Sequence, residues 1–360
     1  MKRIIVIGQF PPPIHGLSHA LQTLINSQLS QEFKLIKLDI KDNKKFVNHC
    51  AKIIQSKTDG WYFTPAQTAG GNLRDLVYMM LMAISKKPII VHLHGGGFKK
   101  AYEKMNYFQK RLNQFVFSRV SKGIVLSDSL KEILLPVMDI KKISVVNNFV
   151  DSECTMDDIT FKNKQVSQKN KKSLKILYLS NFIRSKGYDI VLEIANRLSK
   201  IYYIQLEFNF AGAFLDVGER EYFFNKLKQM NSQSILFHGI VEGSTKKKLF
   251  AESDIFILPT QYPIEGQPIS ILEAMANGCC ILSTPHAGIP DIIKSGINGY
   301  LIPQDCVEEY CNKIIELNTQ RELLTRIGKT NYEKAKSKYL ISCHIEALRA
   351  EFENTYLKTI

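Results

Sequence analysis

The sequence predicts an α/β protein built from two doubly wound, Rossmann-like domains in series. Short, uniformly apolar runs, typical of buried parallel strands, alternate with segments of helical periodicity and with turns containing Gly or Pro. The 360 residues are enough for two domains, each with its own core. A strand-first pattern starts at residue 2 and starts again at residue 174, which indicates two similar halves.

The first half alternates strands and helices in the order expected of a parallel sheet. Its predicted strands are 2–8, 33–40, 61–64, 88–94, 123–126 and 143–146. Its predicted helices are 17–29, 44–56, 75–85, 99–121 and a short one that ends at 135 after a cap at Ser127 or Ser129.

The second half repeats this alternation after a polar, Lys-rich segment without clear periodicity, which we predict to be an interdomain linker. Its predicted strands are 174–179, 205–211, 234–238, 254–259 and 300–303, with one more after a helix that begins near Ile269 and ends before Gly278. Two helical segments follow, to about 327 and from 331 onward.

The stretch from Tyr262 to Gly299 organises the second half. A loop with Pro263, Gly266 and Pro268 joins the strand 254–259 to the helix that starts near Ile269. This order places the free amides of a helix start at the carboxyl edge of a parallel sheet, where an anion such as a diphosphate can bind.

Two carboxylates, Glu265 and Glu273, bracket this loop with seven residues between them. Carboxylates accept hydrogen bonds from vicinal hydroxyls, which a sugar nucleotide offers on its sugar and on its ribose. The alternative is an ordinary helix with an acidic start. The string Glu-Gly-Gln-Pro-x4-Glu-Ala-Met-Ala-x-Gly, followed by Ala-Gly-Ile-Pro-Asp-Ile-Ile and Asn-Gly, favours the ligand site.

This string resembles the Glu-x7-Glu region of family four retaining glycosyltransferases, also called glycosyl transferases group one, of the bacterial surface-polysaccharide type. The resemblance implies the GT-B fold, two Rossmann-like domains with a cleft between them. It implies an acceptor-binding domain over 1–155, a linker over 156–173, a nucleotide-sugar domain over 174–335, and a C-terminal helix over 336–360 that packs back on the first domain.

The resemblance also implies roles for individual residues. Glu265 would hold the donor sugar and Glu273 the ribose. The loop and helix start would contact the donor through Gly266, Gln267, Pro268, Ile269 and Ser270. Gly16, in the turn after the first strand, matches a glycine-rich loop that faces the donor diphosphate, and Ile240 and Val241 would contact the nucleobase.

The turn after strand 174–179 reads Ser180-Asn-Phe-Ile-Arg-Ser-Lys-Gly187 and carries two cations that could neutralise a leaving diphosphate. The family usually has Gly-Arg at the start of this turn and Lys-Gly at its end. Lys186 matches the family pattern, whereas Asn181 stands at the usual arginine position and Arg184 lies three residues later. An ordinary solvated turn charge fits Arg184 better than Lys186.

His-Gly-Gly-Gly ends the predicted strand 88–94. The same motif forms an oxyanion loop in esterases, but the chain has no Gly-x-Ser-x-Gly elbow. A zinc site on His92 and His94 lacks a third ligand in the sequence. The resemblance places His94 against the donor sugar, with His92 as the fallback, and a structural core histidine remains the alternative for each.

The charge of the chain is concentrated in its first half. Residues 1–150 hold 22 Lys and Arg against 9 Asp and Glu, whereas the whole chain has a net charge of +14. A basic surface attracts anionic lipid, nucleic acid or an anionic small molecule. The segment 99–121 could be a basic amphipathic helix on a membrane, or a helix that packs its apolar stripe on the sheet.

Seven cysteines without a Cys-x-x-Cys pair favour a reducing cytoplasm. The apolar run 4–7 is too short for a signal-peptide core, and the run 76–84 is well short of the ~20 residues that span a bilayer. We therefore expect a cytoplasmic protein at the inner face of the cell membrane, in peripheral contact with anionic lipid.

The resemblance implies an enzyme that moves a hexosyl unit, with retention, from a nucleoside diphosphate sugar such as a UDP-sugar. The expected acceptor is a hydroxyl of a lipid-linked saccharide in O-antigen, capsule or exopolysaccharide synthesis. No Asp-x-Asp metal motif is present, so we expect neither a metal nor a cofactor. The alternatives are a nucleotide-sugar epimerase and a catalytically silent binding subunit; a nucleic-acid protein is the weakest, because no stacking platform or groove-reading helix accompanies the charge.

Overall fold

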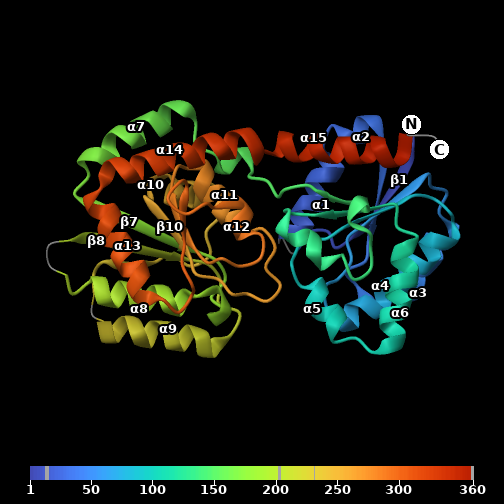
Figure 1. Ribbon diagram of the computed structural model, residues 1–360, viewed down its shortest axis with the longest axis horizontal. Coiled ribbons are helices and arrows are strands. Elements are labelled where there is room, and N and C mark those ends of the chain that lie inside the picture. Colours follow the sequence, from blue (N-terminus) through green and yellow to red (C-terminus); the bar gives the residue numbers. More distant parts are fainter. Residues whose placement is uncertain (13–15, 202–203, 231, 358–360) are drawn as a thin grey trace. The chain divides into compact units, whose positions relative to one another are not determined.

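The computed structural model of the chain describes residues 1–12, 16–201, 204–230 and 232–357. The chain forms two compact units (Figure 1). The first unit comprises Met1–Asn148, Ile264–Gln267 and Ser342–Ile360, and the second comprises Phe149–Pro263 and Pro268–Ile341. Each unit contains one six-stranded sheet in which all paired strands are parallel. The predicted α/β class with two Rossmann-like units is confirmed.

The first sheet has the strand order β2-β1-β3-β4-β5-β6. Its strands are β1 (Arg3–Gly8), β2 (Lys34–Asp39), β3 (Gly60–Phe63), β4 (Ile89–His92), β5 (Lys122–Val125) and β6 (Ile143–Val145). The α-helices of this part of the chain are α1 (Gly16–Asn26), α2 (Leu29–Glu32), α3 (Phe46–Gln55), α4 (Ala69–Ile84), α5 (Phe98–Glu103), α6 (Tyr107–Ser118) and α15 (Ile341–Phe352). Helices α3, α4 and α6 lie on one face of the sheet, and α2 and α15 lie on the other (Figure 1).

The second sheet has the order β12-β11-β10-β7-β8-β9. Its strands are β7 (Ser173–Leu179), β8 (Gln205–Ala211), β9 (Ile235–Phe237), β10 (Ile255–Leu258), β11 (Cys280–Ser283) and β12 (Gly299–Leu301). Its helices are α7 (Asp158–Asn170), α8 (Tyr188–Leu198), α9 (Val217–Met230), α10 (Gly243–Glu252), α11 (Ile269–Ala276), α12 (Ile289–Ile292), α13 (Val307–Thr319) and α14 (Arg321–Lys338). The central strands β7, β10 and β11 are buried almost throughout, which explains their uniformly apolar sequences.

Most of the segment 156–173, predicted from its composition to be an interdomain linker, forms helix α7 and groups with the second unit. The Asp157 side chain caps the helix by accepting from the Thr160 amide at 2.8 Å. Polar contacts anchor the helix: buried Lys164 donates to the carbonyls of Ser253 and Asn277 at 2.6 and 2.7 Å. A helix held by such contacts needs little apolar periodicity, so its pattern misled the prediction.

Three further segments differ from the prediction. The single helix expected over 99–121 is two helices, α5 and α6, because Asn106 caps α6 by accepting from the Gln109 amide at 2.9 Å. Helix α4 begins six residues before the predicted start, at Ala69, after the cap residue Thr68. The short helix expected before residue 135 is a 3₁₀ turn, Ser129–Ile133.

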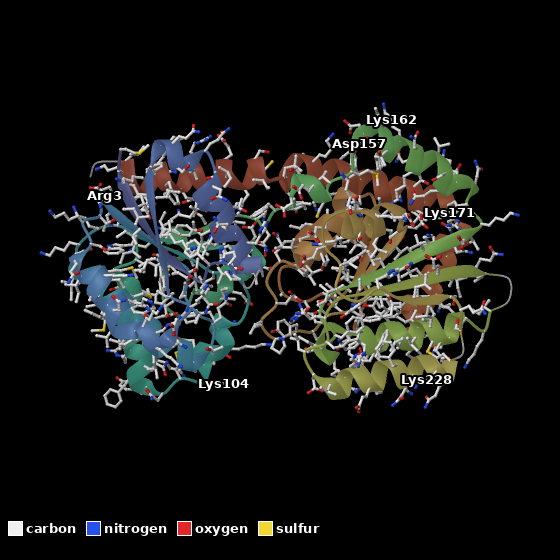
Figure 2. The ribbon with its side chains drawn as sticks, turned by 180° about the vertical axis from the view of Figure 1, so that it is seen from behind. Arg3, Lys104, Asp157, Lys162, Lys171 and Lys228 are labelled. Atoms are coloured by element: carbon white, nitrogen blue, oxygen red, sulfur yellow. The ribbon has the colours of Figure 1, made fainter. Side chains whose placement is uncertain are left out.

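The C-terminal helix α15 and the turn after it belong to the first unit from Ser342 onward. Phe352 packs edge-to-face on Phe33, with 5.4 Å between the ring centroids. The hydroxyl of Tyr356 donates to the Trp61 carbonyl at 2.7 Å. These aromatic contacts complete the core of the first unit next to β3. Figure 2 shows side chains from many elements filling the interiors of the units, while labelled lysines such as Lys104, Lys162 and Lys228 project outward.

Candidate functional site

The carboxyl edge of the second sheet is the candidate ligand site, because open parallel sheets bind ligands where the strand order reverses. That reversal lies between the adjacent strands β7 and β10. The turn 180–187 follows β7, and the loop that starts at Pro259 follows β10. The Gln261 amide donates to the Ser185 carbonyl at 2.7 Å, so the two loops are joined directly.

Gly187 fits this junction for two reasons. Its backbone has φ +78°, which favours glycine, and a Cβ there would lie 2.3 Å from the Pro259 carbonyl oxygen. A glycine is therefore required where the turn after β7 passes the end of β10. This explains why a glycine follows Lys186 in the sequence.

Lys186, the predicted diphosphate partner, stands immediately before Gly187 in this turn. Its ammonium lies 4.5 Å from the ring centroid of Tyr262, a cation–π contact that holds it at the β10 loop. The Tyr262 carbonyl in turn accepts a hydrogen bond from His286 Nε2 at 2.8 Å. The lysine is thus placed at the switch point of the sheet, where a diphosphate would need a cation.

Arg184 has other partners. Its Nε donates to Glu219 at 3.0 Å, and its guanidinium lies 4.2 Å from the ring centroid of Tyr222, both on α9. The same carboxylate accepts from the Tyr188 hydroxyl. The Arg184 side chain is 51% exposed. Its role toward a diphosphate stays a prediction, and in that role it would have to leave Glu219.

Glu273 lies inside α11 and is buried. Its carboxylate accepts a hydrogen bond from Lys246 Nζ of α10 at 2.6 Å. Burial raises the pKa of Glu273, and the Lys246 ammonium counteracts that rise. Although burial disfavours the Lys246 ammonium, Glu273 raises the pKa of Lys246 above its usual value. The two side chains lie within ion-pair distance, at 2.6 Å.

Lys246, the partner of the predicted site residue Glu273, is a residue that sequence reasoning missed. It lies in a run of three lysines, Lys246 to Lys248, which looks like a solvated helix surface. The residue that could have indicated the orientation of Lys246 is Phe250, which is buried and lies four residues later. Residues four apart share a helix face, so Lys246 had to point inward with Phe250.

Helix α11 begins at Ile269 after the cap residue Pro268, which provides no side-chain cap. The first-turn amides of Ile269 and Ser270 therefore belong to a helix start that a ligand could satisfy. Asn181, another predicted donor contact, is exposed in the turn after β7. Its carbonyl accepts from the Tyr178 hydroxyl at 3.1 Å.

Ile240 and Val241 follow the end of β9. Ile240 is 71% exposed and comes directly after Gly239, which has φ +68°. The structure thus presents an apolar side chain at the sheet edge where the nucleobase contact is predicted.

Residues 264–267, with Glu265, Gly266 and Gln267, group with the first unit. The Gly96 amide donates to the Ile264 carbonyl at 3.3 Å. A Cβ on Gly96 would lie 2.2 Å from the Glu265 carbonyl oxygen. The glycines after β4 therefore allow the backbone of the Glu265 segment to approach closely.

Gln267 is fixed by Asn148. Its side-chain oxygen accepts from the Asn148 amide at 2.7 Å, and its carbonyl accepts from the Asn148 side chain at 2.8 Å. The backbone amide and the side chain of Asn148 thus hold Gln267 at two points.

His94 follows β4 in the first unit. Both of its ring nitrogens are buried, and neither has a hydrogen-bond partner among the described residues. Its ring packs on His92, with 4.0 Å between the centroids, and His92 Nδ1 forms a hydrogen bond with the Tyr62 hydroxyl at 2.5 Å. Burial, with His344 nearby, lowers the pKa of His94 to about 3. His94 is therefore neutral at physiological pH.

His344 of α15 completes this cluster. Its ring stacks on His92 at 6.5 Å between centroids, and its Nδ1 donates to the Asn147 carbonyl at 2.6 Å. Burial lowers the pKa of His344 to about 4, and burial with the two neighbouring histidines lowers the pKa of His92 well below its usual value. No pattern in the sequence indicates that His344 joins His92 and His94.

A cavity of about 200 Å³ lies beside His94 in the first unit. Its lining includes Gln9, Gln67, Arg74 and His92. Gly16, predicted to face the diphosphate, is exposed as the first residue of α1. The residues just before it, including His15, lie outside the described part of the chain.

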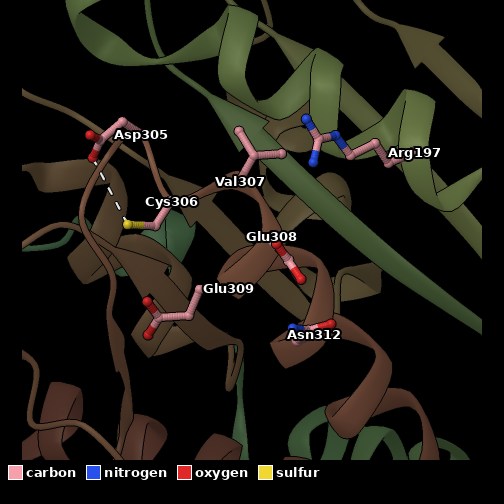
Figure 3. Close-up of a pocket in the computed structure, with 7 residues that line it drawn as sticks. All are labelled: Arg197, Asp305, Cys306, Val307, Glu308, Glu309 and Asn312. Carbon is pink, nitrogen blue, oxygen red and sulfur yellow. Dashed lines mark hydrogen bonds between the residues drawn. The ribbon is translucent and has the colours of Figure 1, made fainter.

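A larger pocket, of about 550 Å³, lies in the second unit between α8 and the start of α13 (Figure 3). Its lining combines Arg197 with Asp305, Glu308 and Glu309. Arg197 is ion-paired with Glu193 at 2.8 Å and lies in the last turn of α8, away from the carboxyl edge where α8 begins. Its excess of carboxylates would repel a diphosphate, so this pocket is not the donor site.

Within residues 1–12, 16–201, 204–230 and 232–357, no group of three or more His, Cys, Asp or Glu is arranged to hold a metal ion. None of the helices in the described ranges combines the length and the apolar character that crossing a bilayer demands.

Residues 160–334, just under half of the chain, match the family described as Glycosyl transferases group 1. The fold of the two units is GT-B. The structure of Anabaena Alr3699/HepE in complex with UDP matches with a TM-score of 0.77 and 15% identity, over 98% of this chain and 100% of that one.

Two curated relatives are informative. An uncharacterised glycosyltransferase of Methanocaldococcus jannaschii is 24% identical over 274 residues, 71% of this chain and 67% of that protein. A UDP-Gal:α-D-GlcNAc-diphosphoundecaprenol α-1,3-galactosyltransferase of Escherichia coli is 26% identical over 254 residues, 66% of this chain and 62% of that protein.

Proposed function

We propose that this protein is a retaining hexosyltransferase. It would move a hexosyl unit from a nucleoside diphosphate sugar, with a UDP-sugar as the first candidate, to a hydroxyl of a lipid-linked saccharide in surface-polysaccharide synthesis. The observation that carries the proposal is Lys186, held on Tyr262 at the switch point of the sheet in the segment that matches the group 1 family. The UDP complex of HepE and the acceptor of the Escherichia coli relative support the donor and acceptor classes.

The chemistry would depend on stabilising the leaving diphosphate. Lys186 and the amides at the start of α11 provide positive charge and donors where negative charge develops. Glu265 and Glu273 are assigned to different parts of the donor, sugar and ribose, rather than to a glycosidase-type pair. His94, neutral and with unpartnered ring nitrogens among the described residues, is assigned to the donor sugar.

We further propose that the reaction needs no metal, because these cations and amides can take the charge of the diphosphate themselves. Transfer activity should be unchanged by EDTA, and stimulation by added Mg²⁺ or Mn²⁺ after EDTA treatment would contradict this. The basic first half of the chain supports peripheral attachment at the inner face of the cell membrane.

The function is tested by nucleotide binding and by transfer. UDP should raise the melting temperature of the native protein more than GDP or ADP does, because a ligand that binds only the folded state stabilises it. Substituting Lys186→Met should lower kcat by about 100-fold, the usual effect of losing one group that stabilises transition-state charge. Lys200→Met, an exposed lysine in the turn after α8, is the matched control.

Three outcomes would contradict the proposal. One is that no nucleoside diphosphate raises the melting temperature. Another is full transfer activity in Lys186→Met. The third is conversion of the nucleotide sugar in the absence of any acceptor, which would indicate an epimerase.

A further inference from the structure

The outer surface of three helices in the first unit carries apolar side chains where water should favour polar ones. On α4, Leu73, Val77, Met80 and Ile84 are all exposed, and we call them the apolar stripe. At 3.6 residues per turn, the four positions fall within about 60° of one another around the helix. Ile84 is 75% exposed. The stripe lies opposite the buried face of the same helix, which includes Leu76, Tyr78, Met79 and Met82.

The neighbouring helices continue this pattern. Helix α4 packs against both α3 and α6. On α6, Tyr107, Phe108 and Phe115 are exposed, Phe108 at 83%, and on α3 Val47 and Ile54 are exposed. The helices on the other face of the sheet, α1, α2 and α15, carry no exposed large apolar residue in the described ranges. Among the α-helices of the first unit, the exposed large apolar residues of the described ranges therefore lie on α3, α4 and α6.

The charge on this face is mostly positive, although Lys45 pairs with Asp42 at 3.8 Å. Helices α3, α4 and α6 contain a single carboxylate between them, Asp75, which is buried and paired with Arg74 at 2.7 Å. Exposed cations border the apolar side chains. They are Lys45, Lys52, Lys86, Lys87, Arg111 and Arg119. Arg111 lies on the same side of α6 as Phe108 and Phe115, since the three positions fall within about 60° of one another around the helix.

We propose that this face, formed by α3, α4 and α6, docks on the surface of a bilayer that contains anionic lipid. Apolar side chains with a cationic border match the boundary between acyl chains and anionic headgroups. A second copy of the chain fits less well, because an isologous contact would set the same cations against one another. This inference rests on the proposed function and deepens it, because an enzyme docked on the bilayer lies close to a lipid-linked acceptor.

Sedimentation with vesicles tests the docking. The wild-type chain should sediment with vesicles of phosphatidylcholine and phosphatidylglycerol but not with phosphatidylcholine alone. Raising the salt should weaken binding, because the Debye length shortens from about 10 Å at 0.1 M to about 3 Å at 1 M. The double variant Ile84→Ser/Phe108→Ser should lower the partition coefficient by at least about tenfold, because each side chain loses its apolar contact with the acyl chains.

The chain offers a matched control on the second unit. Ile159 and Val166 of α7 are also exposed apolar residues, at 74% and 67%. Ile159→Ser/Val166→Ser removes a similar amount of exposed apolar surface, and it should leave the partition coefficient unchanged. Both double variants should keep the wild-type melting temperature and its rise with UDP, which shows that they are folded.

Equal vesicle binding by the two double variants would overturn the docking face. So would equal binding of wild type to neutral and anionic vesicles. A wild-type dimer that becomes a monomer only in Ile84→Ser/Phe108→Ser would assign the face to a second copy instead. If vesicle binding fails while UDP still raises the melting temperature, the docking is wrong and the proposed transferase is not. If anionic vesicles bind but UDP does not raise the melting temperature, the docking is supported and the proposed transferase is contradicted.

Discussion

At the scale of single residues, the pair of Lys246 and Glu273 joins α10 and α11 of the candidate site at 2.6 Å. A carboxylate buried inside a helix is costly unless a partner compensates its charge. Lys246 provides that partner at 2.6 Å and opposes the rise that burial causes in the pKa of Glu273. The acidic residue that the sequence predicts to hold a ribose therefore depends on a lysine from a different helix.

Removing the lysine should reveal this dependence. Lys246→Met leaves Glu273 buried without its partner, so we expect the second unit to lose up to about 3 kcal/mol of unfolding free energy. The rise in melting temperature with UDP should also shrink. Circular dichroism melts with and without UDP measure both effects.

Two comparisons make this prediction specific. Lys248→Met removes a cation 75% exposed that pairs with Glu252 at 3.7 Å, and it should change stability by less than about 1 kcal/mol. The double variant Lys246→Met/Glu273→Gln should recover much of the stability lost in the single variant. Equal losses in the two lysine variants would show that the buried pair does not matter.

At the scale of turns and helices, the junction between the turn 180–187 and the loop after β10 is tightly packed. Gly187 and Gly296 have almost the same backbone conformation, with φ +78° and +80°. A Cβ at Gly187 would lie 2.3 Å from the Pro259 carbonyl oxygen, whereas a Cβ at Gly296 would meet nothing within 4 Å. The two glycines thus separate backbone strain from steric conflict.

Substituting each with alanine gives a direct prediction. Gly296→Ala should cost about 1 kcal/mol, the strain of a left-handed conformation. Gly187→Ala should cost at least about 2 kcal/mol more, because Pro259 and the loop after β10 must shift. Urea unfolding of both variants measures the difference, and a similar cost for both would show that the junction yields easily.

The elements that the sequence predicted well are those whose own residues determine them. Strand 205–211 and the start of α11 at Ile269 were predicted at the observed positions, since apolar runs and Gly/Pro turns are local signals. Helix α7 and the break between α5 and α6 were missed. Lys164 and Asn106 determine them through contacts with carbonyls and amides that composition does not reveal.

The candidate site divides in the same way. Lys186 and Gly187 could be predicted from sequence because their motif is contiguous, and the role of Lys186 stays a prediction. Lys246, Asn148 and His344 were not assigned to the site, because each meets its partner only through the folded chain. Long-range pairs of this kind are the part of a site that a single sequence does not specify.

For the first unit as a whole, the histidine cluster contributes to the response to acid. His92, His94 and His344 come from β4, the segment after it and α15, and all three are neutral in the folded first unit. An unfolded histidine titrates near 6.5. Below that pH the unfolded chain binds more protons than the folded one, so stability must fall as the pH falls.

Trp61 makes this measurable, because it is the only tryptophan in the chain and is buried in β3 of the first unit. Unfolding followed by its fluorescence should lose up to about 1.4 kcal/mol per pH unit for each neutral histidine between pH 6.5 and about 4. His344→Gln should have a shallower slope in that range. Between pH 7 and 8 the two slopes should agree, and identical slopes at acid pH would exclude the cluster as the cause.

The first unit is assembled from three separated pieces of chain, and the last piece brings Phe352 and Tyr356 onto the core beside β3. During synthesis on a ribosome, residues 149–341 emerge before that final piece does. The second unit can therefore finish folding before Phe352 and Tyr356 are available to the core of the first unit. A nascent chain arrested before residue 342 should leave its N-terminal half open to chaperones and proteases.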